Sequence, residues 1–158
     1  MSMDLVMLKT PSGALVPGDS EATEALRKIK TGKALRMSAT RMRNYEFHKK
    51  FFALVNFAYE HWEPGELPDA RWRGVQPEKT FDRFRKDLII LAGFYEATYR
   101  LDGSVRIEAQ SISFGRMDED DFEALYSKVI NVVLKHVLRN YTREDLDHVV
   151  EQILRFDG

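Results

Sequence analysis

The chain has 158 residues, no cysteine and a net charge of −1, with 44% hydrophobic and 31% charged residues. This composition and length are typical of one globular domain that folds without a disulfide or a metal. The absence of cysteine excludes zinc–thiolate sites, iron–sulfur clusters and a cysteine nucleophile. The near-neutral net charge argues against a general DNA coat. We also expect no membrane segment, because the longest apolar runs are far too short to span a bilayer.

Charge is distributed unevenly along the chain. Residues 27–50 carry nine bases and one acid, a local charge of +8, whereas residues 117–158 carry ten acids and five bases, a local charge of −5. This asymmetry indicates a basic surface for a polyanion or an acidic partner. The alternative is that the two regions face each other in the fold or across a dimer.

Two short strands and a helix are predicted at the N-terminal end. The stretch DLVMLKTPSGALVPGD has apolar residues on both sides of a Pro-Ser-Gly turn, which predicts a hairpin. Asp19 or Ser20 can cap a helix over residues 21–30, with acids in its first turn and bases in its last. The alternation in KALRMSAT, residues 33–40, predicts a half-buried strand.

The next element is an amphipathic helix in RMRNYEFHKKFFALVNFAYEHW, residues 41–62. Apolar residues recur at helical spacing from Tyr45 to Trp62 and cover more than half the girth towards the C-terminal end. We therefore expect this helix to be the central helix of the core. Its first half, residues 41–50, carries bases on another side, and this charge needs a separate explanation.

The remaining elements follow a loop at residues 63–77, which is rich in proline, glycine and charge. A helix centred on Phe84 comes next. GFYEATYRLDGSVRIEAQSISFG predicts a β hairpin, with Asp102-Gly103 or Gly103-Ser104 at the turn and aromatic and β-branched residues in the arms. Two helices close the chain at residues 117–139 and 142–156, and they open on DEDD and on the capping pattern TRED.

This order of elements predicts an α+β fold in a single domain, residues 1–158. We expect an antiparallel sheet from the hairpins, packed against the central amphipathic helix and followed by two C-terminal helices. The last two helices are apolar enough either to form a homodimer interface or to complete a monomer core.

Motifs for catalysis are absent from the sequence. It contains no phosphate-binding loop, no serine elbow and no HExxH pair. Asp118–Asp121 are expected to cap a helix rather than to hold a metal. We therefore predict no catalytic residue, no metal ligand and no cofactor. The alternative is a metal-dependent nuclease, with His48 and carboxylates brought together by the fold.

Bases beside aromatic residues are typical of proteins that bind single-stranded nucleic acid, because charges follow the backbone and rings stack on bases. Trp72 in the RWR triplet could stack, or could fold onto the core. Asn44 and His48 share a helix face and could read a nucleotide. Alternatively, Asn44 bonds a neighbouring loop and His48 is a core residue. The predicted nucleic-acid-binding residues are Arg41, Arg43, Asn44, His48, Lys49, Lys50, Arg71, Trp72 and Arg73.

Two long stretches resemble a known family. RNYEFHKKFFALVNFAYEHW and AGFYEATYRLDGSVRIEAQSISFGRMDEDDFEALYSKV resemble the bacteriophage family called domain of unknown function thirteen sixty-seven (DUF1367), and the N-terminal LVPG and KIKTG also fit. The resemblance covers nearly the whole chain. It implies a phage or prophage origin and a location in the cytoplasm of a bacterial host. The family carries no assigned catalytic residues.

The basic-aromatic helix is also similar in style to that of the NinB/Orf phage recombination mediators. This second resemblance rests on Arg43, Asn44, His48, Lys49, Ala53 and Leu54. It implies binding to single-stranded DNA and to the host single-strand-binding protein. We therefore expect a non-enzymatic phage accessory protein of DNA metabolism that binds single-stranded nucleic acid through its basic helix. The alternative is a phage protein that binds and modulates a host protein complex, as an inhibitor or as a nucleic-acid mimic with an acidic C-terminal region.

Overall fold

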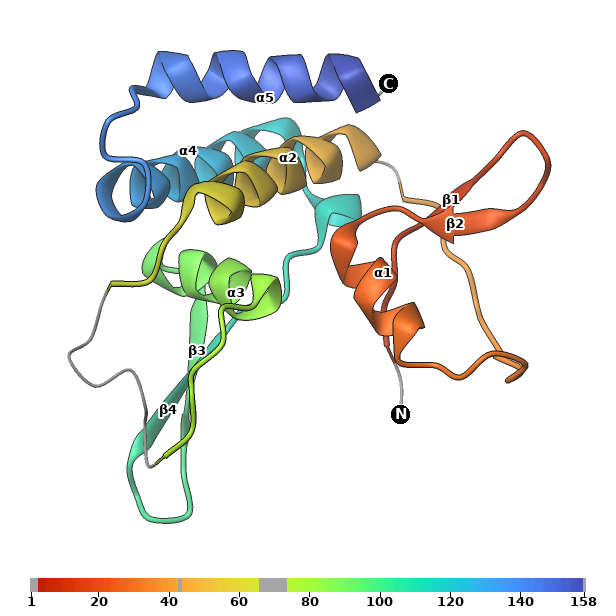
Figure 1. Ribbon diagram of the computed structural model, residues 1–158, viewed down its shortest axis with the longest axis horizontal. Coiled ribbons are helices and arrows are strands. Elements are labelled where there is room, and N and C mark those ends of the chain that lie inside the picture. Colours follow the sequence, from red (N-terminus) through yellow and green to blue (C-terminus); the bar gives the residue numbers. More distant parts are fainter. Residues whose placement is uncertain (1–2, 43, 66–73, 158) are drawn as a thin grey trace. The chain divides into compact units, whose positions relative to one another are not determined.

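The computed structural model describes residues 3–42, 44–65 and 74–157. These residues form five α-helices, one short 3₁₀ helix and two separate two-stranded antiparallel sheets (Figure 1), so the predicted α+β class is confirmed. The chain divides into two compact units, residues 1–40 and residues 41–158. In the described part of the chain, no helix has the length and apolar character that crossing a membrane requires.

The first unit begins with the predicted N-terminal hairpin. Strand β1, Met7–Lys9, pairs antiparallel with β2, Leu15–Pro17. The main-chain N–H of Thr10 donates to the carbonyl of Ala14 at 2.8 Å and closes the turn. Gly13 has a φ of 90°, in the left-handed region that glycine adopts without strain. The turn residues of the sequence therefore form the turn that was predicted.

Helix α1, Ser20–Arg27, follows in the same unit. The Asp19 carboxylate accepts a hydrogen bond from the N–H of Ala22 at 2.7 Å, which confirms the predicted cap. The helix ends three residues earlier than predicted. Ala22 is the one buried residue among the described residues of this unit.

The predicted strand over residues 33–40 is wrong. These residues run as irregular, exposed chain that belongs to no sheet. Leu35 and Met37, on the face expected to be buried, are 48% and 61% exposed. No strand of the described residues pairs with this segment. Its small residues, Ala34, Ser38 and Ala39, also bring little apolar surface to bury.

The second unit is built around three helices that lie side by side: α2, Tyr45–His61, α4, Glu119–His136, and α5, Arg143–Asp157 (Figure 1). Helix α3, Phe81–Leu91, packs against α2 and α4. The predicted role of α2 as the central helix is confirmed, because it buries Phe51, Phe52, Ala53, Leu54, Val55 and Ala58. Helix α5 adds buried residues too, so the last two helices complete this core.

Capping side chains fix the starts of α4 and α5 as predicted. The Asp118 carboxylate accepts from the N–H of Asp121 at 2.8 Å. At α5, the hydroxyl of Thr142 accepts from the N–H of Asp145 at 3.2 Å, and the Asp145 carboxylate accepts from the N–H of Thr142 at 2.8 Å. This reciprocal pair is a capping box with aspartate in the place of glutamate. The clustered acids therefore serve the helix termini.

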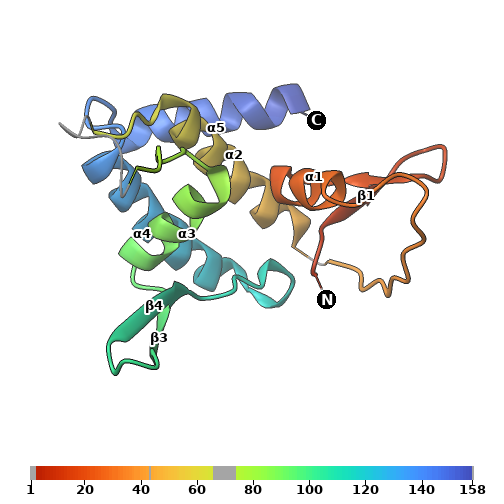
Figure 2. The ribbon, with the colours of Figure 1, turned by 60° about the horizontal axis from the view of Figure 1, so that its bottom comes forward.

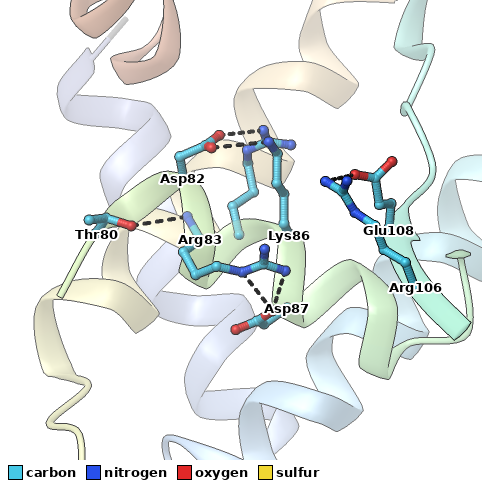
Figure 3. Close-up of polar contacts among 8 residues, drawn as sticks. Thr80, Asp82, Arg83, Lys86, Asp87, Arg106 and Glu108 are labelled. Carbon is cyan, nitrogen blue, oxygen red and sulfur yellow. Dashed lines mark hydrogen bonds and ion pairs between the residues drawn. The ribbon is translucent and has the colours of Figure 1, made fainter. Parts of the chain in front are cut away.

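Helix α3 carries its own charge network (Figure 3). The Thr80 hydroxyl accepts from the N–H of Arg83 and caps the helix. Arg83 then pairs with Asp87 at 2.7 Å, and Lys86 pairs with Asp82 at 3.1 Å. Pairs at this spacing on an exposed helix each add a few tenths of a kcal/mol at most.

The second hairpin joins strand β3, Tyr95–Tyr99, to strand β4, Val105–Ala109. Gly103 takes a φ of 85° in its turn, and the Asp102 carboxylate accepts from the N–H of Ser104 at 2.9 Å. Figure 2 shows the hairpin next to α3, on the side of this unit away from α5. The predicted Asp-Gly turn is thus confirmed.

Candidate functional site

An exposed basic region of the described chain is the basic segment, residues 28–36. Its bases are Lys28, Lys30, Lys33 and Arg36, all exposed. Within the described residues, none of the four forms an ion pair, whereas the neighbouring Arg27 pairs with Glu24 at 3.0 Å. Four cations in nine residues without a carboxylate partner create a positive potential that a polyanion would neutralise.

The local sequence explains why this segment stays open. Helix α1 ends at Arg27, and Gly32 turns the chain with a φ of 84°. No acid occurs between Glu24 and Glu46, so no side chain in this stretch can neutralise the bases locally. Arg41, the first residue of the second unit, is exposed as well. Of the predicted site residues that the structure describes, Arg41 is the one that is exposed.

The two lysines of α2 already interact with acidic and aromatic side chains of α2 and α4. Lys49 Nζ lies 3.1 Å from the Glu46 carboxylate. Lys50 Nζ lies 3.8 Å from the Glu123 carboxylate and 4.6 Å from the ring centroid of Tyr126. Both are partly buried, so these cations are already compensated by acids and aromatic rings.

Asn44 and His48 have the structural roles that the sequence analysis gave as alternatives to nucleotide recognition. The Asn44 amide donates to the main-chain carbonyl of Met117, in the loop before α4. His48 is 4% exposed and stacks on Phe52 at a centroid distance of 4.5 Å, with its ring edge-on to Phe114. A phosphate contact needs an accessible donor, so we leave both residues out of the proposed interface.

The remaining predicted residues, Arg43, Arg71, Trp72 and Arg73, lie outside the described residues. The other tryptophan, Trp62, packs on Phe84 at a centroid distance of 5.1 Å, and Lys79 lies over its ring. Trp62 is therefore held by the core, and a base-stacking role would fall to Trp72.

A polar pocket of about 420 Å³ lies among α2, α4 and α5. Tyr126 forms part of its lining and is 2% exposed, and its hydroxyl has no hydrogen-bond partner among the described residues. Burial, followed by the nearby carboxylates of Asp147 and Glu123, raises the pKa of Tyr126. The hydroxyl thus stays protonated. The charges around it are mixed in sign, from Lys50, Glu123, Arg143, Asp147 and Glu151.

Within the described residues, the acids that suggested a nuclease do not gather at one possible metal site. In the described residues, no group of three or more histidine and carboxylate side chains could hold a metal ion. Asp118 and Asp145 act as caps, and His48 is buried among aromatic rings. Metal-dependent hydrolysis therefore has no assembled centre in this part of the chain.

Sequence reasoning about the site concentrated on the basic helix and missed Lys28, Lys30, Lys33 and Arg36. They contribute to the local +8, but they were placed in a helix terminus and a strand. The signal in the sequence is the combination of closely spaced bases with no acid between Glu24 and Glu46.

The family model described as Protein of unknown function (DUF1367) matches residues 1–68 and 66–156. The chain therefore belongs to this family. No curated protein and no solved structure matches it.

Proposed function

We propose that this protein is a phage accessory protein of DNA metabolism that binds single-stranded nucleic acid. The binding residues are the four bases of the basic segment, residues 28–36, together with Arg41. The observation that carries the proposal is that these five cations are exposed and lack ion-pair partners among the described residues. An extended basic chain can follow a flexible phosphate backbone without a preformed groove.

The phage origin and the recombination role rest on resemblance. The chain belongs to the DUF1367 family. The phage association that this resemblance implies supports a phage or prophage source and a place in the bacterial host. The similarity of the Arg43–Leu54 stretch to NinB/Orf mediators supports single-stranded rather than double-stranded nucleic acid as the ligand. Because Asn44 and His48 serve the fold, the similarity supports the class of ligand and not the positions of the contacts.

A salt titration tests the electrostatic part of the proposal. Five phosphate contacts on single-stranded nucleic acid give a log–log salt slope of about −3.5, so affinity should fall roughly 100-fold between about 50 mM and 200 mM salt. The probe is a fluorescent oligothymidylate, measured by anisotropy. An affinity independent of salt would exclude phosphate contacts as its source.

A pair of matched variants locates the contacts. The test variant carries Lys30→Glu, Lys33→Glu and Arg36→Glu. The control carries Lys9→Glu, Arg116→Glu and Arg139→Glu, three exposed bases whose reversal changes the net charge equally. The test variant should lower the salt slope by about 2 or more, whereas the control should keep most of the affinity. Equal losses in the two variants would mean that net charge, and not the basic segment, governs binding.

Stacking by Trp72 is the second part of the proposal. The chain has two tryptophans, and Trp62 is packed against Phe84. Fluorescence quenching on addition of the oligonucleotide should therefore persist in Trp62→Phe and disappear in Trp72→Phe. Quenching that survives in Trp72→Phe would remove the RWR triplet, Arg71 to Arg73, from the interface.

Binding to a host protein is the other candidate function. It draws support from exposed acids of α4 and α5 whose carboxylates are not used as caps, such as Glu119, Asp120, Glu144 and Asp147. An acidic surface of this kind can compete with nucleic acid for a basic host protein. Capture of one stoichiometric host protein by the wild type, lost when Glu144 and Asp147 are reversed to lysine, would favour this candidate.

A further inference from the structure

The β3–β4 hairpin presents an apolar face to solvent. Cross-strand partners lie on the same side of a hairpin, so the pairs Tyr95–Ala109, Ala97–Ile107 and Tyr99–Val105 form one face. Along this face, Tyr99 is 85% exposed and Val105 is 53% exposed. A two-stranded sheet needs further strands or packing against a helix to be stable in water, and this hairpin packs against α3 while Tyr99 and Val105 stay more than half exposed. The hairpin therefore resembles half of a larger sheet.

Each strand of the hairpin has one outer edge, and the hydrogen-bonding groups on the outer edge of β4 have a defined register. Inside the hairpin, the N–H of Gln110 donates to the main-chain carbonyl of Phe94, and the N–H of Arg100 donates to the main-chain carbonyl of Ser104. Hydrogen-bonded and non-hydrogen-bonded pairs alternate along an antiparallel ladder. The N–H and C=O groups of Val105, Ile107 and Ala109 must then point away from β3. Among the described residues, no strand pairs with β4 on that side.

The sequence of β4, Val-Arg-Ile-Glu-Ala, is complementary to itself in the antiparallel direction. If two copies of β4 pair about a two-fold axis at Ile107, Ile107 faces its own symmetry mate in a hydrogen-bonded pair. Val105 then faces Ala109 of the other copy, again through groups that point outwards. The pairing that uses the outward-pointing backbone groups of β4 is therefore the same pairing that matches its side chains across the two-fold axis. Arg100 also donates to the Val105 carbonyl at 3.0 Å, and a carbonyl oxygen has room for a second donor.

The charges agree with this register. Arg106 and Glu108 form an ion pair within β4 (Figure 3), and both are more than half exposed. In the two-fold pairing, Arg106 of each copy lies directly opposite Glu108 of the other. Both sit in non-hydrogen-bonded pairs, where cross-strand side chains are closest. Pairing two copies of β3 about Ala97 would place Glu96 opposite Thr98 and give no charge pair.

We propose that β4 is a homodimer interface, which pairs antiparallel with β4 of a second copy of this chain about a two-fold axis at Ile107. The product is one four-stranded sheet with its apolar side chains on a single face. Exposed strand edges otherwise invite non-specific pairing, and opposite charges at fixed positions select this one register. This proposal does not depend on nucleic-acid binding.

Sedimentation equilibrium or light scattering after size exclusion measures the mass of the intact protein across a concentration series. The wild type should dimerise. Arg106→Glu or Glu108→Arg alone should raise the dimer Kd at least about tenfold, because each creates two like-charge pairs per dimer. The double variant Arg106→Glu/Glu108→Arg restores opposite charges and should regain the dimer. Lys9→Glu, in the other hairpin, is the control.

Circular dichroism melting shows that each variant is folded, so a change in mass reports on association. A wild-type protein that stays monomeric at every concentration would overturn the proposal. So would a dimer that is insensitive to both single reversals, or one that the double variant fails to restore, because association would then use another surface or another protein.

Discussion

The side-chain amide of Asn44 donates a hydrogen bond to the main-chain carbonyl of Met117, 73 residues further along the chain. Asn44 immediately precedes α2, and Met117 ends the 3₁₀ helix η1, Phe114–Arg116, shortly before α4. The bond therefore ties the start of one core helix to the approach of another. The stacked rings of Phe47 and Phe122, 4.5 Å apart, lie in the first turns of the same two helices.

Replacing Asn44 by alanine should lower the free energy of unfolding by about 1–2 kcal/mol, because the carbonyl of Met117 loses its donor in a partly buried position. Urea denaturation measures the change. Asn140→Ala, at an exposed position, is the control and should change stability by less than about 0.5 kcal/mol. Affinity for the oligonucleotide should be unchanged in Asn44→Ala. A loss of affinity without loss of stability would return Asn44 to the interface.

Lys50 and Lys49 should differ in their importance for stability, although they are adjacent in sequence. Lys50→Glu removes a cation from the ring of Tyr126 and places a second carboxylate beside Glu123. We expect a cost of about 1–2 kcal/mol. Lys49→Glu disturbs a pair within one helix, in which the partner Glu46 is exposed, and should cost about 0.5 kcal/mol. Thermal melting compares the two, and equal shifts in Tm would contradict the packing role of Lys50.

Tyr126→Phe should leave the protein as stable as the wild type or stabilise it by up to about 1 kcal/mol, because the variant removes a buried hydroxyl that has no hydrogen-bond partner among the described residues. Tyr59→Phe is the matched control. The Tyr59 hydroxyl donates to the Lys79 carbonyl at 3.2 Å, so its loss should destabilise by about 1 kcal/mol. Urea midpoints at neutral pH give both values. Clear destabilisation in Tyr126→Phe would mean that this hydroxyl binds a group in the polar pocket.

Asp145 should contribute to the loss of folding stability at acidic pH. Hydrogen bonds from the backbone and hydroxyl of Thr142 hold the pKa of Asp145 below its ordinary value of 3.8. A lowered folded-state pKa means that the stabilisation is fully present above the ordinary value and is lost as pH falls through the folded-state value. The stability difference between wild type and Asp145→Asn should therefore be constant from neutral pH to about pH 5 and shrink below about pH 3.8. A difference that does not change on acidification would contradict the assignment.

Local chemistry made much of the second unit predictable. The Asp-Gly turn, the cap at Asp118 and the box at Thr142 need only residues that are near in sequence, and all three are present. The apolar periodicity of α2 correctly marked the central helix, because a helix that is apolar over half its girth has to be buried.

The features that could not be predicted depend on contacts between residues that are distant in the sequence. Alternation over residues 33–40 satisfied a strand pattern, but a strand also needs a partner edge, which a single segment of sequence does not reveal. Whether His48 faces solvent depends on Phe114, 66 residues away, and the compensation of Lys50 depends on Glu123. Charge counted along the sequence therefore located a basic region, but not the side chains in it that remain available.

The openness of the chain after α1 also makes it a natural cutting point for a protease specific for lysine and arginine. Residues 30–41 are exposed throughout, and they include Lys30, Lys33, Arg36 and Arg41. Apart from Ala22, the buried residues that the structure describes lie beyond residue 41, so the fragment that starts there keeps the helical core. Brief tryptic digestion should release that fragment early. If oligonucleotide slows these cuts but not cuts at Arg139 or Arg155, the pattern of protected bonds gives a footprint of the ligand on the protein.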